Sequence, residues 1–387
     1  MKLLYANDHR GEHAPSWYRT NCPIPGRAPL EHHISADVCV IGAGFTGLAA
    51  ALELSGRGYD TVVLDAHRVG WGASGRNGGQ LGSGFNMDQL TLEGVMGKPA
   101  AHALWQIAQA AKTHIHQLCE AHSIDMDYRP GIIHAQHRRR GVQAMHDYCD
   151  HLSRHYGYDA MEPLGLTDVR RRIDSQNYFG GVIDHGAGHI HPLKLASGVA
   201  QAAEQAGTRI HELSEVLRIA PCSRSMAQRV ITAGGSVLCG KVILAVNGYL
   251  DNLHPSLNRW VMPINNFIIV TEHLGERAAS LLPQDDAVAD SRFVVNYFRR
   301  VDTDRLLFGG GENYSYRFPV SIERNVRRAM LGIFPQLQDV AIDYAWGGTL
   351  AITRNRLPSI RRLSPELYSS GGYSGHGLAL AFMYGTA

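Results

Sequence analysis

A single stretch, residues 36–65, constrains the fold of this chain more than any other part of it. Residues 36–41 form a short apolar run rich in β-branched side chains, which is typical of a strand buried on both faces. Three glycines in the spacing G-x-G-x-x-G follow at 42–47, and apolar residues then recur at helical spacing. A second apolar run at 61–64 ends in Asp65, so the stretch predicts a strand–helix–strand unit that binds a dinucleotide.

The three glycines and the final aspartate of this unit each have a distinct physical role. Gly42 permits a tight turn, Gly44 lets a pyrophosphate approach the backbone, and Gly47 lets the helix pack closely on the strand. The start of the helix supplies free N–H groups and the positive end of the helix dipole. Asp65 is expected to accept hydrogen bonds from the ribose hydroxyls of the adenosine.

A second glycine-rich block, residues 70–80, follows shortly after the first unit. It combines five glycines with Ser74, Arg76, Asn77 and Gln80, which is too polar a mixture for a protein core. Its position directly after the nucleotide unit argues against an idle linker. We expect its backbone N–H groups and polar side chains to line the far half of the bound dinucleotide.

Beyond residue 88 the pattern changes to that of a second structural unit. Apolar residues from Leu104 to Cys119 form one stripe on a long helix, and most segments between 262 and 349 have strand character. Tyr and Asn at their polar positions suit a sheet that walls a substrate pocket. We expect strands at 131–135, 209–211, 216–219, 229–232, 237–246, 267–271, 293–298, 306–309, 343–346 and 367–370, and helices at 139–156 and 321–334.

Composition excludes several classes of function. The formal net charge is only +2 and no stripe of Lys and Arg with interleaved aromatics occurs, so no nucleic-acid partner is expected. No run approaches about 20 consecutive apolar residues, so no membrane span is expected. The polar N-terminus lacks the apolar core of a signal peptide, which predicts a cytoplasmic protein.

Cysteine and histidine usage gives no sign of a disulfide framework or of a metal site. The six cysteines are scattered without a C-x-x-C pair, and the 21 histidines form no metal-ligand spacing. His189 and His191 precede Pro192 and a predicted helix, so we expect them to pack and to cap rather than to catalyse.

With these segments in hand, the chain resembles the D-amino-acid-oxidase family of FAD-dependent oxidoreductases, and within it the γ-glutamylputrescine oxidase branch. Five motifs carry the resemblance, in family order and over nearly the whole chain. The block G-A-S-G-R-N-G-G-Q is the most specific of them. The motifs are Ala36–Gly44, Gly70–Gln80, Gly188–Pro192, Asp343–Trp346 and Ser374–Gly377.

The resemblance implies an α/β fold with two domains, together with an N-terminal arm at 1–34. The first is a discontinuous, Rossmann-like FAD-binding domain of the D-amino-acid-oxidase type. The second is an α+β substrate domain built on an antiparallel sheet. The expected boundaries are 35–87, 186–250 and 345–387 for the FAD domain, and 88–185 and 251–344 for the substrate domain.

The motifs and the resemblance together give the candidate cofactor-binding residues. The FAD is expected to be non-covalent, because relatives that attach it use a cysteine near the chain end, whereas the last cysteine here is Cys239. The candidates are Gly42, Gly44, Phe45, Thr46, Gly47, Asp65, Ala66, Gly72, Ala73, Ser74, Arg76, Asn77, Gly78, Gly79, Gln80, Val216, Ala245, Gly248, Gly375, His376, Gly377 and Leu378.

The activity that the resemblance implies is oxidation of an amine C–N bond, with dioxygen as the second substrate and hydrogen peroxide as a product. Gln80, Tyr297 and His376 are the candidate catalytic residues, and Glu312 is a candidate to hold a cationic amine. A helix that starts at 375–377 would present free N–H groups to the negative charge of the reduced flavin.

Three alternatives stay open at this point. The first is a different substrate on the same machinery: a D-amino acid, glycine, sarcosine or a longer polyamine. Because the chain ends at Ala387, about two turns into its last helix, a flavin-binding protein without turnover is the second alternative. A dehydrogenase that uses nicotinamide alone is the third, although residues 70–80 would have no use in it. The sequence leaves the oligomeric state open.

Overall fold

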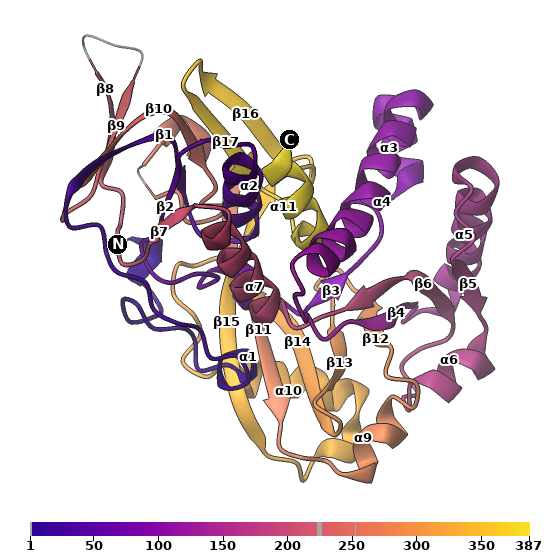
Figure 1. Cartoon of the computed structure of the whole chain (residues 1–387). Helices are drawn as coiled ribbons and strands as arrows, with labels where there is room; N and C mark the ends of the chain where they lie inside the picture. The colour runs from indigo at the N-terminus through magenta and orange to yellow at the C-terminus, as the bar shows by residue number, and fades with distance from the viewer. Residues whose placement is uncertain (1, 223–226, 252) are drawn as a thin grey trace.

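The computed structural model describes residues 2–222, 227–251 and 253–387, and places them in two β-sheets with helices packed around them (Figure 1). The first sheet has the strand order β16-β17-β10-β1-β2-β7, with the β8–β9 hairpin attached to β10. Its strands are β1 (His33–Ile41), β2 (Thr61–Leu64), β7 (Arg209–His211), β8 (Arg218–Pro221), β9 (Gln228–Ile231), β10 (Ser236–Leu244), β16 (Ser359–Ser364) and β17 (Leu367–Gly371).

The centre of this first sheet is parallel. Strand β1 pairs in parallel with both β2 and β10, which explains why its last four residues and all of β2 are buried. Val38 and Val40 point to the core beneath α2 (Phe45–Gly56), whereas Cys39 and Ile41 point to the opposite core. The predicted strand–helix–strand unit is therefore present, with α2 packed against α7 (Pro192–Gln205) and α11 (Gly377–Thr386).

The second sheet has the order β15-β11-β14-β13-β12-β4-β6-β3, with β5 paired to β6. The sequence predicted an antiparallel sheet here, but the observed sheet is mixed, because β12 pairs with β4 in parallel. Its strands are β3 (Gln80–Leu81), β4 (Arg129–Ala135), β5 (Met161–Leu164), β6 (Gly181–His189), β11 (Val261–Thr271), β12 (Ala287–Asp290), β13 (Tyr297–Val301), β14 (Arg305–Asn313) and β15 (Ile342–Thr353).

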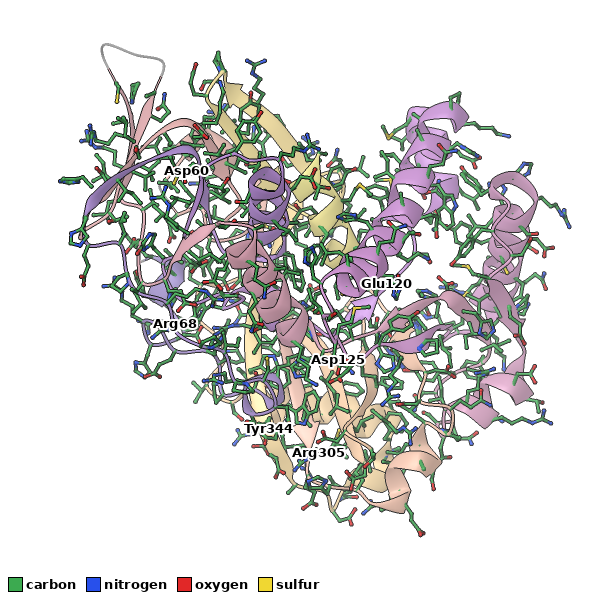
Figure 2. All side chains as sticks on the ribbon, viewed as in Figure 1. Asp60, Arg68, Glu120, Asp125, Arg305 and Tyr344 are labelled. Carbon is green, nitrogen blue, oxygen red and sulfur yellow. The ribbon has the colours of Figure 1, made fainter. Side chains whose placement is uncertain are left out.

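Helices cover the second sheet and extend to one side of it (Figure 1). Helix α10 packs on β11, β14 and β15 over a core that includes Phe298, Phe308 and Phe334. In Figure 2, Arg305 and Tyr344 lie at the end of this sheet that points away from Asp60, the residue just before β2 of the first sheet. The remaining helices are α1 (Trp17–Thr20), α3 (Gln89–Met96), α4 (Lys98–Ala121), α5 (Val142–Tyr156), α6 (Leu166–Arg172), α8 (Pro255–Asn258), α9 (Glu276–Leu281) and α10 (Ile322–Ile333), with 3₁₀ turns at Leu3–Tyr5, Ala73–Gly75, Arg139–Gly141 and Pro335–Leu337. The division of the chain into domains stays a prediction.

Two sequence-based assignments of strands were wrong. The predicted strand at 293–298 begins only at Tyr297, because the Asp290 carboxylate accepts the backbone N–H groups of Arg292 and Asn296, at 3.1 Å each, and closes a turn. The predicted strand at 216–219 is displaced as well, since β8 runs from Arg218 to Pro221.

The longest strand that the sequence did not predict is β6. Its glycines and polar residues interrupt the apolar pattern that usually indicates a strand. Two of those glycines lie where a side chain has no room. A Cβ on Gly181 would lie 2.2 Å from the carbonyl oxygen of His134, and one on Gly188 would lie 2.4 Å from that of Arg129. Close pairing with β4 therefore requires glycine at both positions.

One buried arginine joins three segments that are distant in the sequence. Arg299 on β13 is 5% exposed. Its guanidinium donates to the carbonyl oxygens of Gly78 (2.9 Å) and Ile190 (2.8 Å) and to the hydroxyl of Tyr18 (3.1 Å). Tyr18 is fully buried and so anchors the N-terminal arm on the rest of the protein. Arg299 thus fixes the arm and the glycine-rich block to the second sheet.

Replacing Arg299 with Met is expected to lower the free energy of unfolding by on the order of 2–5 kcal/mol, because buried carbonyls and a buried hydroxyl lose their donor. Arg154→Met is the matched control, since Arg154 pairs with Asp150 on the surface of α5 with its side chain 75% exposed. A surface pair of this kind contributes about 0–1 kcal/mol. Urea unfolding of both variants measures the difference, and equal losses would contradict the role assigned to Arg299.

Candidate functional site

A cavity of about 270 Å³ lies at the carboxyl ends of the parallel strands of the first sheet. Such ends are where open α/β sheets bind their ligands. Its walls come from the turn after β1, the two residues after β2, residues 71–74 and 215–217, and residues 245–247, 249–251 and 253 after β10. Lys2 and Leu4 of the N-terminal arm also line it, and no pattern in the sequence indicated that they would lie here.

The three glycines of the turn are each required for a different reason. Gly42 has a φ of +107°, and a Cβ there would lie 2.6 Å from the carbonyl oxygen of Ala245 on the neighbouring strand. A Cβ on Gly47 would lie 1.9 Å from the carbonyl oxygen of Gly42, so the helix can approach the strand only at glycine. Gly44 has an ordinary φ of −88°, but a Cβ there would lie 2.9 Å from Ser74 Oγ.

The start of α2 fits a phosphate group. Ser74 Oγ accepts the N–H of Phe45 at 3.0 Å, while helix geometry leaves the other N–H groups of the first turn without intrahelical partners. Gly42 and Gly44 line the cavity directly, so a ligand can approach the backbone there. N–H groups and the positive end of the helix dipole are the groups that bind a pyrophosphate.

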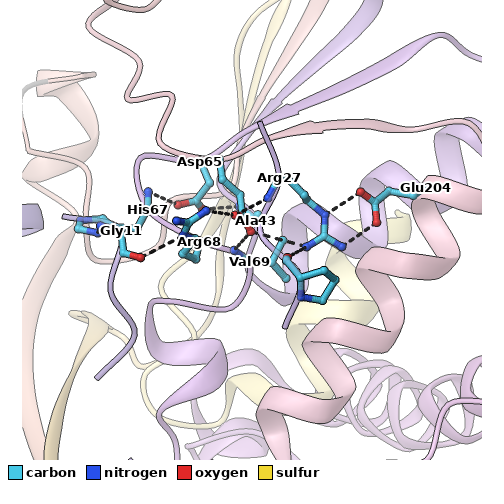
Figure 3. Close-up of polar contacts among 10 residues, drawn as sticks. Gly11, Arg27, Ala43, Asp65, His67, Arg68, Val69 and Glu204 are labelled. Carbon is cyan, nitrogen blue, oxygen red and sulfur yellow. Dashed lines mark hydrogen bonds and ion pairs between the residues drawn. The ribbon is translucent and has the colours of Figure 1, made fainter. Parts of the chain in front are cut away.

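Asp65 borders the cavity and also holds the glycine turn in place (Figure 3). Its Oδ2 accepts the N–H of Ala43 and its Oδ1 accepts the N–H of His67, both at 2.7 Å. Burial raises the pKa of Asp65 to about 6, against the opposing effect of these two donors. Because each carboxylate oxygen has two lone pairs, Asp65 retains capacity to accept a ribose hydroxyl.

The glycine-rich block divides into residues that line the cavity and residues that hold the loop. Gly72, Ala73 and Ser74 line the cavity, as does Trp71. Arg76 does not, because it is 4% exposed and donates to Trp71 O (2.6 Å), Gly347 O (3.1 Å) and Asp8 Oδ2 (2.9 Å).

Asn77 also stabilises this loop from within. Its Nδ2 donates to the carbonyl oxygens of Ala73 and Ser74, at 3.0 Å each, and its Oδ1 accepts the N–H of Gly79 at 2.8 Å. Gly78 and Gly79 then lead the chain into β3. The sequence placed Arg76, Asn77, Gly78 and Gly79 at the cofactor, and none of them lines this cavity.

Some of the other predicted cofactor residues line the cavity and some do not. Ala66, Val216 and Ala245 line the cavity, whereas Gly248 instead faces the carbonyl oxygen of Leu350. The side chains of Phe45 and Thr46 face the C-terminal part of the chain, since Phe45 packs on the Phe382 ring and Thr46 Oγ1 lies 2.6 Å from Tyr373 OH. Only their backbone is available to a ligand in the cavity.

The three candidate catalytic residues lie along one short segment, residues 78–82. The ring of Tyr297 lies against Gly78, where a Cβ would be 2.5 Å away, and His376 Nε2 lies 3.9 Å from the position of a Cβ on Gly82. Gln80 lies between them and donates to Val288 O at 2.9 Å. They are outside the cavity described above, with Gly375, Gly377 and Leu378 at the start of α11 beside His376.

The environment sets the protonation of these groups. Burial lowers the pKa of His376 to about 4, so its imidazole is neutral at pH 7. Burial raises the pKa of Tyr297, whose hydroxyl donates to Asn266 Oδ1 at 2.6 Å. Glu312 pairs across the β11–β14 register with Asn266, and its carboxylate accepts the hydroxyl of Tyr314 at 2.9 Å.

The histidines before α7 have the structural roles that the sequence predicted for them. His191 accepts the N–H of Lys194 at 3.1 Å and so caps α7, and His189 is bonded to Asp285 O at 2.9 Å.

All six cysteines are free. Over residues 2–222, 227–251 and 253–387, no cluster of His, Cys, Asp and Glu is suited to a metal ion, and no helix has the length and apolarity needed to cross a membrane.

Comparison with known proteins gives consistent matches. A family model described as FAD dependent oxidoreductase matches residues 37–387. The chain is 38% identical to the gamma-glutamylputrescine oxidoreductase of Escherichia coli over 97% of this chain and 88% of that protein. It is also 38% identical to a probable oxidoreductase OrdL of Rhizobium meliloti, over 95% of this chain and 85% of that one.

Solved structures share the fold at lower identity. Glycine oxidase from Geobacillus kaustophilus superimposes with a TM-score of 0.77 at 20% identity, covering 91% of this chain and 93% of that one. L-proline dehydrogenase from P. horikoshii superimposes with a TM-score of 0.72 at 18% identity, covering 91% and 92%. These two show that the mixed α/β architecture is shared.

The tight contact between Gly44 and Ser74 allows the phosphate role of Gly44 to be separated from its packing role. Gly44→Ala is expected to lower the stability of the flavin-free protein. Ser74→Ala in the same chain is expected to restore part of that loss, because it removes the crowded oxygen but also the acceptor of the Phe45 N–H. The double variant should still lose the stabilisation by FAD, because the new methyl group borders the phosphate site. At 100 times the Kd that stabilisation is about 2.7 kcal/mol in the unaltered protein.

The measurement is thermal unfolding with and without FAD, with Ser74→Ala alone as the control. The control should keep a measurable gain with FAD. If the double variant gains as much stability from FAD as the control does, the turn is not the phosphate site.

Proposed function

The chain belongs to the family of FAD-dependent oxidoreductases of the D-amino-acid-oxidase type, which act on C–N bonds, and from that premise we propose that it oxidises γ-glutamylputrescine or a related polyamine. The observation that carries the proposal is the 38% identity to a gamma-glutamylputrescine oxidoreductase over 97% of the chain. The relatives named for sarcosine and glycine are more distant, at 25% and 23% identity.

The reaction proposed removes two electrons and two protons from the amine, and water then hydrolyses the resulting imine to an aldehyde and ammonia, or to an aldehyde and an amine where the oxidised nitrogen is secondary. FAD supplies the electron acceptor when it is bound. Dioxygen is proposed as the final acceptor, with hydrogen peroxide as its product. The residues of the glycine turn, Asp65 and Ser74 would hold the dinucleotide part of FAD, and segment 78–82 with the start of α11 would border the reacting part.

The charge state of the predicted catalytic residues suits a cationic amine. His376 is neutral at pH 7 and therefore does not repel an ammonium group. The Tyr297 hydroxyl stays protonated because burial raises its pKa, so it positions its neighbours rather than removes a proton. Glu312 would supply the negative charge that holds the distal part of the substrate. The start of α11 would offer N–H groups to the negative charge of a bound flavin after its reduction.

A peroxide-coupled assay with γ-glutamylputrescine, putrescine, spermidine, sarcosine, glycine and D-amino acids tests the proposal. We expect the highest kcat/KM with γ-glutamylputrescine or another polyamine. A higher kcat/KM with an amino acid would overturn the proposed substrate class.

Flavin absorbance recorded without oxygen is the companion measurement. If a polyamine bleaches the flavin but no peroxide forms in air, the proposed substrate class stands and dioxygen is not the electron acceptor. Flavin that no amine bleaches would overturn the proposed activity. The cytoplasmic location stays a prediction.

A further inference from the structure

The N-terminal segment Lys2–Tyr5 forms a wall of the dinucleotide cavity, although it precedes the nucleotide-binding unit by about thirty residues. Lys2 and Leu4 both line the cavity. Among the described residues that line the cavity, Lys2 alone has a cationic side chain, whereas Asp65, Glu215 and Asp251 are acidic. The segment therefore contributes the positive charge on a wall that is otherwise negative or neutral.

Two acidic residues hold this segment against the first sheet. Glu215 accepts Lys2 Nζ at 2.5 Å and the hydroxyl of Tyr5 at 2.7 Å, one on each carboxylate oxygen. Asp251 Oδ1 accepts the backbone N–H of Leu3 at 3.0 Å. Both acids lie more than 200 residues away in the sequence, so these contacts arise only in the folded chain.

His67 fixes the other side of the segment. Its Nε2 donates to Leu4 O at 2.9 Å, and its Nδ1 accepts the N–H of Gly11 at 3.1 Å, which defines the neutral tautomer. Burial lowers the pKa of His67 to about 4, in agreement with a neutral ring. The ring also stacks on Trp71, a lining residue, with centroids 3.7 Å apart.

The wall stands at the adenosine end of the cavity. Asp65 follows β2 at the position where an acid contacts the ribose in such folds, and Glu215 directly precedes Val216, a predicted cofactor-binding residue that lines the same cavity. The candidate catalytic residues lie outside this cavity, along 78–82. Contacts from Lys2–Tyr5 therefore concern the adenosine half of a bound dinucleotide rather than its flavin half.

Asp251 carries an oxygen that lacks a partner. Its Oδ2 is buried, and no described residue donates a hydrogen bond to it. The backbone of Asp251 is also left-handed, with a φ of +42°, a conformation that costs free energy at a non-glycine residue. A buried acceptor without a donor is costly as well, and a donor on a ligand would offset this second cost. Adenosine offers such donors in its exocyclic amine and its ribose hydroxyls.

We propose that Lys2–Tyr5, held by Glu215 and Asp251, closes the adenosine end of the FAD site, and that Asp251 Oδ2 accepts a hydrogen bond from the adenosine half of FAD. The inference deepens the proposed function because it takes the same cavity as the FAD site. It assigns cofactor selectivity to residues outside the glycine-rich motifs.

Asp251→Asn is the most direct test. The amide keeps one oxygen for the N–H of Leu3, and Asn tolerates a left-handed backbone, but an NH₂ group replaces the unpartnered acceptor. Loss of a hydrogen bond to a charged group corresponds to about a tenfold or larger rise in the Kd of FAD. The Kd of ADP should rise by the same factor, and that of FMN, which lacks adenosine, should stay the same.

Tyr5→Phe tests the closure separately. It removes one bond to Glu215, and FAD dissociation should accelerate by about threefold to tenfold for a bond of this kind. Tyr156→Phe is the matched control, because Tyr156 on α5 donates to Glu93 at the same 2.7 Å far from the cavity lining. The control should release FAD at the unaltered rate.

Flavin fluorescence on the flavin-stripped full chain, with calorimetry for ADP, gives these constants without turnover. An unchanged FAD Kd in Asp251→Asn would overturn the adenosine contact, and an equal loss of FAD and FMN binding would show a general structural effect instead. A dissociation rate in Tyr5→Phe equal to that of the control would overturn the closure. Because no substrate is used, failure of the amine assay leaves these outcomes unaffected, and the reverse also holds.

Discussion

The close approach of four chain segments at the end of β1 is the constraint on which the rest of the structure depends. The turn at Gly42 fits under the carbonyl of Ala245 with no room for a side chain, and Asp65 ties the same turn to β2 through the N–H of Ala43. Ser74 adds the bond to the first N–H of α2. The phosphate site is therefore formed by packing among four segments, and glycine is required at its centre because two strands and a helix converge there.

A long N-terminal arm stabilises this arrangement from outside. Glu212 is fully buried and accepts the N–H groups of Arg27 and Val69 together with the guanidinium of Arg68. Figure 3 shows this part of the arm beside Asp65 and His67. Because the carboxylate of Glu212 is buried and accepts three hydrogen bonds, it holds the arm in one position. Buried Glu212 thus connects the arm to the residues after β2, and buried Arg299 connects the arm and the glycine-rich block to the second sheet.

The sequence predicted the local features well, because they depend on neighbouring residues. The β1–α2–β2 unit, the stripe on α4 and the capping by His191 all follow from periodicity and end signals within a few residues. Strand β6 was missed because its glycines are explained only by the neighbouring strand β4.

Contacts between distant segments explain the other differences. Nothing near Lys2 or Asp251 in the sequence indicates that they meet at one cavity, and nothing near Arg76 indicates that Asp8 neutralises it. The turn held by Asp290 likewise replaced the first residues of a predicted strand, because side-chain acceptance of backbone N–H groups competes with strand pairing. The glycine turn could be predicted because its spacing lies within one short segment, whereas Lys2 and Asp251 are brought together only by the fold.

Heat or acid release of the cofactor from the purified chain tests the central claim, that this cavity holds FAD without a covalent bond. The described residues that line the cavity include neither cysteine nor histidine. The account predicts one FAD per chain, identified by chromatography in the supernatant, with colourless precipitated protein. Flavin that stays with the precipitate would contradict the non-covalent site, and a folded protein that neither contains nor takes up FAD would contradict the claim as a whole.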